Sequence, residues 1–483
     1  MTRLALALLW LLVSANAQAT RTETAGPDAP RSALQLEDVL ASVDAHFPLL
    51  AAARLQRDVA AGSLREARGG FDTRLIAEGE LNEGGFYQNR SGDARLEQNT
   101  RLWGLRFFGG YRVGRGDFPS YDGGRQTNER GEIRGGVELP LLRGGWIDPE
   151  RARLRTAEIG MRRVTPEIEL ERIGFLRQAG LAYWDWLATA LEVGVSRQLL
   201  SEAQERQLQL SGRAARGVVP RIDLVDNERL ILDRAMRLLG AERDAEQAAI
   251  ALSLFLRDGS GAPSIPEPER LPTDFPAEES PDALDVGGDL TRALDRHPLL
   301  LSLSFERERL DVALSLARND RLPGVDLVVE GSNDSGTAAP GISSEGTLSP
   351  DPRGEAEVKA RLRFTFPVQQ REARGRIAVA RAELSRLERR ERFARERIEA
   401  EIRRTIAAVE AAFAQTETAR ENLVLADRLR LAEERKLSLG ASNLIDVNIR
   451  EVQAADAAVA LIRAQAAYFR ARVDYRAAVG VGV

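Results

Sequence analysis

The sequence predicts a mixed α and β membrane protein in which one structural plan occurs twice. Three observations lead to this prediction. Several segments alternate apolar and polar residues, two helical segments are far longer than those of a globular domain, and both features recur in the same order in each half of the chain. Alternation with a period of two is typical of a strand with one apolar face, whereas apolar residues at steps of three and four indicate a helix.

The composition narrows the classes of function. The chain has 483 residues, 68 of them basic and 73 acidic, and its net charge of −5 argues against a nucleic-acid-binding protein. It has no cysteine, which excludes disulfides, thiolate metal sites and cysteine nucleophiles. Its two histidines, His46 and His297, lie just before Pro-Leu-Leu sequences. We take these positions as equivalent in the two halves and expect a shared role in a turn or helix cap rather than in catalysis.

Residues 1–19 have the features of a signal peptide. Arg3 precedes an apolar run over residues 4–13, and small residues follow at Ala15, Ala17 and Ala19. We expect residues 20–33 to form a flexible leader. No later segment has the roughly 20 apolar residues that a membrane-spanning helix needs. The sequence therefore predicts an exported protein that is either soluble or crosses the outer membrane as strands.

Four segments show the alternation of a strand: residues 71–81, 132–140, 325–331 and 357–367. In the last of them, Val358 and Leu362 alternate with Lys359 and Arg361. Since one face of each strand carries charges of both signs, we expect that face to line a water-filled lumen. A half-buried sheet in a soluble protein is the alternative.

The first half contains additional strand-like sequence that has no counterpart in the second. Segments 102–107 and 111–116 flank Gly109-Gly110, which predicts a hairpin there. Residues 84–98, 119–130 and 332–354 are rich in glycine and polar residues and predict loops. The additional hairpin can extend the strands, form an extracellular loop or enlarge the sheet.

Two very long helices are predicted over residues 148–211 and 370–437, and each returns as a shorter helix, over 221–256 and 444–479. Roughly 65 helical residues reach about 100 Å, more than a compact domain spans. Residues 258–288 are rich in proline, glycine and serine and predict a linker. The linker separates repeat 1 (34–257, with strands in 71–141 and a helical hairpin at 148–257) from repeat 2 (289–483, with strands in 325–367 and a hairpin at 370–479).

Each long helix ends at a break in which an aspartate follows a glycine by six residues: Gly217 to Asp223 and Gly440 to Asp446. Glycine allows the left-handed conformation that ends a helix. Pro220 or Asn443 then starts the returning helix. The aspartates lie in its first turn, where a carboxylate can accept hydrogen bonds from free backbone NH groups. Helix capping is therefore the first role that we expect of both aspartates.

This duplicated order resembles the TolC family of outer-membrane efflux proteins, also called outer-membrane factors, over nearly the whole mature chain. Two motifs support the resemblance: Ala182-Tyr183-Trp184-Asp185-Trp186-Leu187 and Leu139-Pro140-Leu141-Leu142. It implies that three copies close one β-barrel in the outer membrane of a Gram-negative bacterium. It also implies that their long helices continue the barrel across the periplasm as a coiled-coil tunnel.

The resemblance further implies a passive conduit from the periplasm to the exterior, in a tripartite efflux or type I secretion system. The expected partners are two further copies of the chain, outer-membrane lipid, a periplasmic adaptor (membrane fusion protein) and an inner-membrane pump, and no nucleic acid. No cofactor, metal or catalytic residue is implied, so the chain is not expected to be an enzyme. The alternative is a soluble periplasmic coiled-coil adaptor, which also carries long helical hairpins.

By the same resemblance, a periplasmic gate is expected at the hairpin tips, with Asp223, Asp226 and Asp446 as its acidic residues. Ile449 stands where the family has a second ring acid, so one or two acidic rings are possible. Arg216 and Lys436 are candidates for pairing with the tip acids. The expected adaptor-docking residues lie at the two breaks: Gly217, Pro220, Gly440, Ser442 and Asn443. Neither the exported substrate nor the class of pump is indicated.

Overall fold

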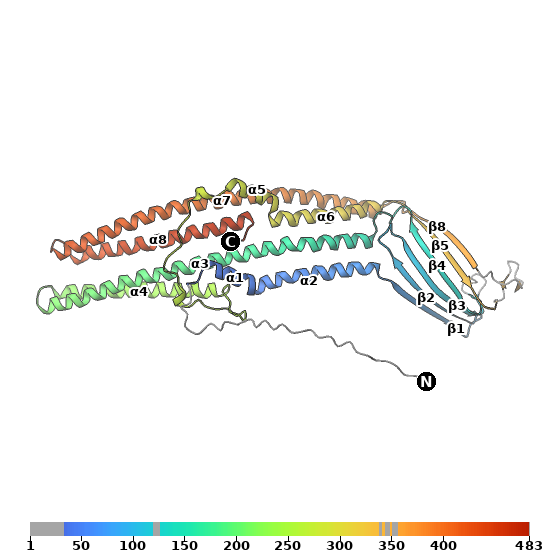
Figure 1. The fold of residues 1–483 in the computed structure, drawn as a ribbon, viewed down its shortest axis with the longest axis horizontal. Helices are drawn as coiled ribbons and strands as arrows, with labels where there is room; N and C mark the ends of the chain where they lie inside the picture. Colours follow the sequence, from blue (N-terminus) through green and yellow to red (C-terminus); the bar gives the residue numbers. More distant parts are fainter. Residues whose placement is uncertain (1–32, 119–125, 338–340, 343–347, 350–355, 483) are drawn as a thin grey trace, which may run out of the picture.

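The computed structural model describes residues 33–118, 126–337, 341–342, 348–349 and 356–482. The predicted signal peptide and all of the leader except its last residue lie outside this part of the chain. The molecule is elongated, with a β-sheet at one end and the tips of two helical hairpins at the other (Figure 1). The predicted mixed α and β fold is confirmed. No helix in the described part is both long and apolar enough to cross a membrane.

Both halves have the same element order, in which two helices lead into strands and a long helix then returns as a shorter one. The first half contains α1 (Leu36–His46), α2 (Pro48–Arg68), β1 (Arg74–Asn82), β2 (Asn89–Asn99), β3 (Arg106–Gly116), β4 (Glu132–Pro140), α3 (Pro149–Ala215) and α4 (Arg221–Ser253). The second contains α5 (Val286–Arg296), α6 (Pro298–Asn319), β5 (Gly324–Asp334), β6 (Gly341–Ile342), β7 (Leu348–Ser349), β8 (Ala356–Thr365), α7 (Arg371–Ser438) and α8 (Leu444–Val479). Short 3₁₀ helices occupy Gly69–Phe71, Pro268–Arg270 and Pro281–Ala283.

The main sheet has six strands in the order β1-β2-β3-β4-β5-β8, and every neighbouring pair is antiparallel. It corrects two predictions. Residues 84–98 were expected to form a loop, but β2 begins at Asn89 and pairs with β1 and β3 along its whole length. The alternation in β2 is interrupted by Ser91, Gly92 and Asp93, so the neighbouring strands, rather than its own pattern, determine its conformation.

The expected hairpin at Gly109-Gly110 is also wrong, because both glycines lie in the middle of the continuous strand β3. A Cβ atom on Gly110 would lie 2.5 Å from the backbone oxygen of Ala94 and 2.8 Å from the Cβ of Arg95. Glycine therefore allows a close approach between β3 and β2 here, and does not mark a turn.

The strand register sorts the side chains onto two faces, as the alternation predicts. We call one the apolar face; it comprises Leu75, Ala77, Leu81, Ala94, Leu96, Phe107, Tyr111, Val113, Ile133, Val137, Leu139, Val325, Leu327, Val329, Val358, Ala360, Leu362 and Phe364. The opposite, charged face includes Glu78, Glu80, Asp93, Arg95, Glu97, Arg106, Arg112, Glu132, Arg134, Glu138, Asp326, Glu330, Glu357, Lys359, Arg361 and Arg363. Large apolar side chains remain open to the surroundings, since Leu75 is 70 % exposed, Ile133 67 % and Phe364 68 %.

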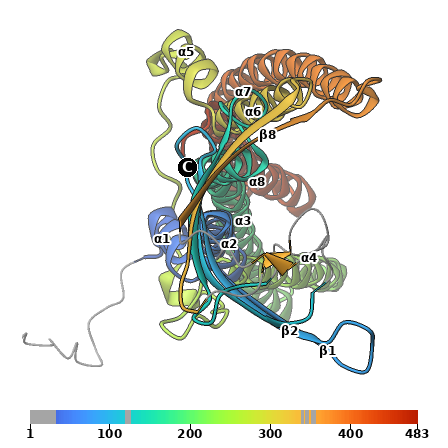
Figure 2. The same ribbon diagram turned by 90° about the vertical axis from the view of Figure 1, so that its right-hand side faces the viewer.

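Four helices meet the sheet. They lie side by side in the order α2, α3, α6, α7, and α2 leads into β1, α3 follows β4, α6 leads into β5 and α7 follows β8. The strands curve across the ends of these helices (Figure 2). Farther from the sheet, α4 packs on α3 and α8 packs on α7 and α3. The sheet thus contains two strands, β2 and β3, that continue no helix.

The aromatic motif of α3 holds distant parts of the chain together. The hydroxyl of Tyr183 donates a hydrogen bond to the backbone oxygen of Leu34 (2.9 Å). The Trp184 ring stacks on Phe469 of α8, with centroids 4.3 Å apart. Phe275, in the interrepeat segment (the predicted linker over residues 258–288), stacks on both rings. The motif therefore joins the start of the described chain, the interrepeat segment and α8 around the middle of the helical region.

The two histidines are not equivalent, contrary to the expectation from their sequence context. His297 is the N-cap of α6, and its Nδ1 accepts a hydrogen bond from the NH of Leu299 (3.2 Å). In the first half, Phe47 is the N-cap of α2, while His46 is the last residue of α1. The prolines that begin α2 and α6 set this alignment, because proline favours the first helical position.

Candidate gate at the helical hairpin tips

Both hairpins turn through the same backbone structure. Gly217 and Gly440 have φ angles of 70° and 74°, in the left-handed region where a side chain is strained. One residue later, the NH of Val218 bonds to the oxygen of Arg213 (3.0 Å), and the NH of Ala441 bonds to the oxygen of Lys436 (2.9 Å). This bond spans five residues and is typical of the Schellman ending of a helix. The left-handed turn expected at each glycine is therefore present.

The returning helices start differently. At α8, the Asn443 Oδ1 accepts a hydrogen bond from the Asp446 NH (2.9 Å), and the Asp446 Oδ2 accepts one from the Asn443 Nδ2 (3.0 Å). At α4, the N-cap is Pro220, which makes no side-chain cap bond. The Asp223 side chain makes no hydrogen bond within the described residues, so it does not cap α4 by hydrogen bonding, although it lies in the first turn, where its charge favours the positive helix end. The cap of α8 is thus Asn443, and the Asp446 carboxylate supports the Asn443 side chain instead of accepting a backbone hydrogen bond as expected.

Two of the three tip acids line a groove between the hairpins. A groove of about 820 Å³ between the two tips is lined by Asp223, Asp226 and Asn443, together with Ile449. Asp446 is exposed and does not line this groove. One subunit therefore brings Asp223 and Asp226 together in the groove and leaves Asp446 just outside its lining, hydrogen-bonded to the groove residue Asn443.

The basic residues near the breaks do not pair with these acids. Lys436 lies 3.1 Å from the carboxylate of Glu433 on its own helix, and the Ser442 hydroxyl donates to the same carboxylate (2.5 Å). The Ser442 hydrogen bond and the nearby ammonium of Lys436 lower the pKa of Glu433 below its usual value. Arg216 forms no ion pair within the part of the chain that the structure describes. Glu433, which sequence reasoning missed, is thus the acid that ties the second tip to the end of α7.

A buried charge network joins the two hairpins just above the tips. Glu451 of α8 and Arg234 of α4 are each 2 % exposed, and Arg234 Nη2 lies 2.6 Å from Glu451 Oε2. Arg206 of α3 bonds to the other oxygen of Glu451 and also to the Asn448 Oδ1 (2.6 Å). Arg234 reaches back to the backbone oxygen of Leu199 on α3 (2.5 Å). The network, which we call the Glu451 network, connects α3 and α4 of the first repeat with α8 of the second.

Sequence reasoning had one signal for this network. Glu228 and Glu451 occupy equivalent positions, 11 residues after Gly217 and Gly440. Glu228, however, is exposed and accepts a hydrogen bond from the Gln207 Nε2 (3.2 Å). The repeat position thus carries a buried ionic contact in one half and a surface contact in the other.

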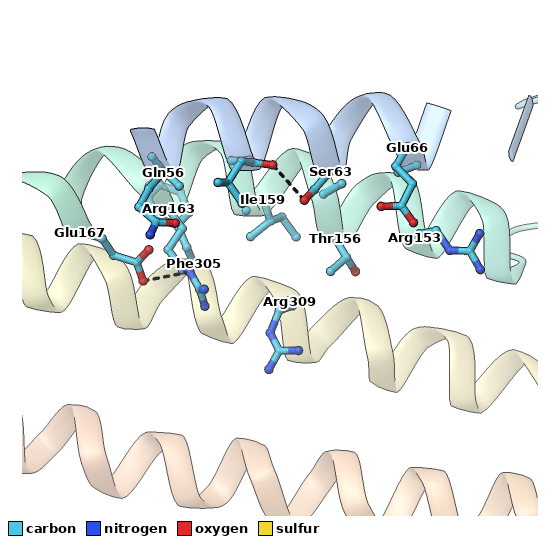
Figure 3. Close-up of a pocket in the computed structure, with 16 residues that line it drawn as sticks. Gln56, Ser63, Glu66, Arg153, Thr156, Ile159, Arg163, Glu167, Phe305 and Arg309 are labelled. Carbon is cyan, nitrogen blue, oxygen red and sulfur yellow. Dashed lines mark hydrogen bonds and ion pairs between the residues drawn. The ribbon is translucent and has the colours of Figure 1, made fainter. Parts of the chain in front are cut away.

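A second groove, of about 420 Å³, lies over α2, α3 and α6 near the sheet (Figure 3). Its charged groups are paired along and between the helices, since Arg163 lies 3.2 Å from Glu167 and 2.9 Å from Glu306. The hydrogen bond from Arg309, with Arg163 close by, lowers the pKa of Glu306. These contacts join neighbouring helices, so we interpret the groove as the packing interface between α2, α3 and α6 and not as a binding site.

Comparisons with known proteins relate the second repeat to a protein family and most of the chain to a known fold. Residues 290–481 match the family model described as outer membrane efflux protein. A comparison with curated protein sequences gives no significant match. These findings do not support the soluble adaptor alternative, because the matched family is one of outer-membrane proteins.

Solved structures share the fold. The VceC outer membrane protein of Vibrio cholerae is 15 % identical, with 93 % of this chain and 96 % of that chain covered and a TM-score of 0.64. The CmeC outer membrane channel of Campylobacter jejuni is 14 % identical, with 92 % and 86 % covered and a TM-score of 0.63. The open-state MtrE channel of Neisseria gonorrhoeae is 15 % identical, with 92 % and 89 % covered and a TM-score of 0.63. Residues 290–481 therefore match the outer membrane efflux protein family, and most of the chain shares the fold of these solved outer membrane channels.

Proposed function

We propose that three copies of this chain form a passive outer-membrane channel, working as the exit duct of a tripartite efflux or type I secretion system. One observation carries the proposal: a sheet with one exposed apolar face and one charged face continues directly into helices of 67 and 68 residues. Helices of that length reach about 100 Å. A membrane wall and a long conduit are thus built into one chain.

The strands have the dimensions of a membrane wall. The six strands of the main sheet are 9 to 11 residues long, and tilted strands of about 9–11 residues cross a bilayer. The apolar face matches a lipid environment, and the charged face, which carries both signs, matches a water-filled lumen. In this arrangement the protein itself performs no chemistry, and energy for transport comes from an inner-membrane pump.

We place the periplasmic gate at the hairpin tips. Asp446 and Ile449 are exposed and lie three residues apart, on one side of α8. Three copies of Asp446 around the axis would form one acidic ring, with an apolar ring of Ile449 beside it. Asp223 and Asp226 act at the groove between the tips. A periplasmic adaptor docks on the turns that carry Gly217, Pro220, Gly440, Ser442 and Asn443.

Fractionation tests the channel. The mature protein should sediment with the outer membrane and run as a trimer that heating converts to monomer. Recovery as a soluble periplasmic monomer would overturn the proposal.

The gate is tested in planar bilayers with two substitutions at one position. Asp446→Asn removes the charge but keeps an oxygen that can accept the hydrogen bond from Asn443, whereas Asp446→Ala removes both. If the acid forms the ring, both variants should raise single-channel conductance or weaken cation preference. If only Asp446→Ala has an effect, Asp446 acts as a helix cap and not as a gate residue.

A further inference from the structure

We propose that β1 of one subunit pairs with β8 of the next, so that three copies close an 18-stranded barrel as wide as the helical tunnel beneath it. This inference rests on the proposed trimeric channel and specifies its wall. The width comes from β2 and β3, the two strands that continue no helix. The partner at each open sheet edge is therefore a second copy of this chain.

Both edges of the sheet are suited to this pairing. Among the strands that the structure describes, β1 and β8 each pair on one side only, and the exposed backbone edge of a strand tends to acquire a partner. Since successive strands of the six-stranded sheet alternate in direction, β1 and β8 run in opposite directions. The β8 strand of one copy therefore meets β1 of the next as an antiparallel pair, and the alternation continues around the ring without a parallel join.

The charged faces of the two edges are complementary. The edge strand β1 carries Glu78 and Glu80 in its distal half and Arg74 at its start, and β8 carries three cations, Lys359, Arg361 and Arg363, with a single acid, Glu357, at its distal end. Opposite charges on neighbouring strands attract, whereas like charges directly opposite repel. A joint of β1 with a second β1, or of β8 with a second β8, would bring like charges together. The edge charges thus favour the head-to-tail ring over a symmetric pair of subunits.

The β2–β3 pair is part of the wall and not a protrusion from it. β2 pairs with β1 from Asn89 to Glu97, and with β3 from Asn89 to Asn99. On the charged face, Arg134 of β4 forms an ion pair with Asp93 of β2, reaching across β3. β4 is already bonded to β3 on one side and to β5 on the other. β1 therefore has no free strand edge on β4 to join, as it would if β2 and β3 lay outside the barrel.

At a strand tilt of about 40°, the dimensions of wall and tunnel agree with the wider ring. Four helices per subunit give twelve around the tunnel, which at about 8–10 Å between axes is a circumference of about 96–120 Å. Eighteen strands spaced about 4.8 Å apart and tilted about 40° have a circumference of about 113 Å. Twelve such strands would give only about 75 Å. With six strands per chain, the lumen continues from tunnel to membrane without narrowing.

Cysteine cross-linking tests the joint directly, since the natural chain has no cysteine. Glu78→Cys is combined in turn with Lys359→Cys, Arg361→Cys and Arg363→Cys in the full-length protein. After oxidation in outer membranes, at least one combination should give covalent dimers and trimers on non-reducing gels. The intrachain control is Ala94→Cys with Tyr111→Cys, which lie opposite each other on β2 and β3 and should form no oligomers.

A second pair, Glu78→Cys with Arg134→Cys, tests the alternative in which β1 joins β4. It should not cross-link, because β2 and β3 lie between these positions. Cross-linking of this pair overturns the inference. The inference is also overturned if the protein is a heat-modifiable trimer in which the intrachain control disulfide forms but no β1–β8 disulfide does. If no such trimer exists in the outer membrane, the proposed channel itself fails, which is a distinguishable result.

Removal of residues 83–116 provides an independent measurement. The deletion excises β2 and β3 and leaves β1 antiparallel to β4, so each subunit keeps four strands. In projection images of the trimer, the diameter of the barrel ring should fall by about one third, from about 36 Å to about 24 Å. A natural ring that already measures about 24 Å contradicts the 18-stranded wall.

Discussion

Glu451→Gln removes the negative charge from a buried site in which two guanidinium groups remain. Glu451 is 2 % exposed and bonds to both Arg234 and Arg206. Removing one partner of a buried ion pair costs about 3–5 kcal/mol, because the remaining charge is left uncompensated. The Glu451 network joins the two hairpins, so this cost falls on their closed arrangement. Local opening of the tips should become about 10²- to 10⁴-fold more frequent, at 1.36 kcal/mol per tenfold change.

Hydrogen exchange of the solubilised trimer measures this opening. Amides in the first turns of α4 and α8 should lose protection in Glu451→Gln. Glu228→Gln is the matched control, since it makes the same change at the equivalent, exposed position and should alter stability by less than about 0.5 kcal/mol. The double variant Arg234→Met, Glu451→Leu should recover most of the protection, because it replaces the buried pair with apolar side chains. Equal exchange in the two glutamine variants would refute the idea that the network holds the tips together.

Three further predictions concern other parts of the chain. Burial lowers the pKa of His297, so the stability that the neutral imidazole contributes is present above its ordinary pKa of 6.5 and is lost as pH falls below that value. An asparagine in its place can cap α6 without titrating. Between pH 7.5 and 5, the Tm of His297→Asn should therefore fall less than that of the natural chain. Gly440→Ala places a side chain at a φ of 74° and should destabilise the turn by about 1–2 kcal/mol, which is measured as faster proteolysis at the tip. Gly212→Ala, inside α3, should leave the proteolysis rate unchanged. Equal cleavage rates in the two variants would contradict this prediction. Trp184→Ala removes a ring stacked on Phe469 and should cost about 3–5 kcal/mol, measured as a lower Tm, and a loss below about 0.5 kcal/mol would show that the stack contributes little.

The sequence predicts those parts of the fold in which local pattern and tertiary environment agree. The segment 132–140 has the bounds of β4, and 357–367 nearly those of β8, because their alternation persists over the whole strand. Both long helices are predicted correctly because their apolar spacing also persists over the whole element, and the glycines that end them are identified as well. β2 and β3 were misjudged because their glycines and short polar residues resemble turns. Pairing on both sides, which no local pattern reveals, makes them strands.

In the candidate gate, too, some residues can be recognised from the sequence and others cannot. Gly217 and Gly440 are recognisable because a left-handed helix ending requires their residue type. Glu451 could not be recognised, because its partners lie 245 and 217 residues away in the chain and are brought close only when the two repeats pack together. The equivalence of Glu228 and Glu451 marks the position but not the difference in burial. Long-range ionic contacts are thus the part of the site that requires a structure.

In the proposed channel, the ion pairs on the charged face also affect how the barrel assembles. Sliding one strand by one residue would turn apolar side chains toward the lumen, so hydrophobicity alone forbids it. Sliding by two residues keeps every side chain on its proper face and moves the strand by about 7 Å. Only specific contacts, such as Arg134 with Asp93 and Arg112 with Glu132, distinguish these two alignments. The paired charges therefore select a single alignment of β2, β3 and β4. The division into apolar and polar faces alone would not distinguish this alignment from one shifted by two residues.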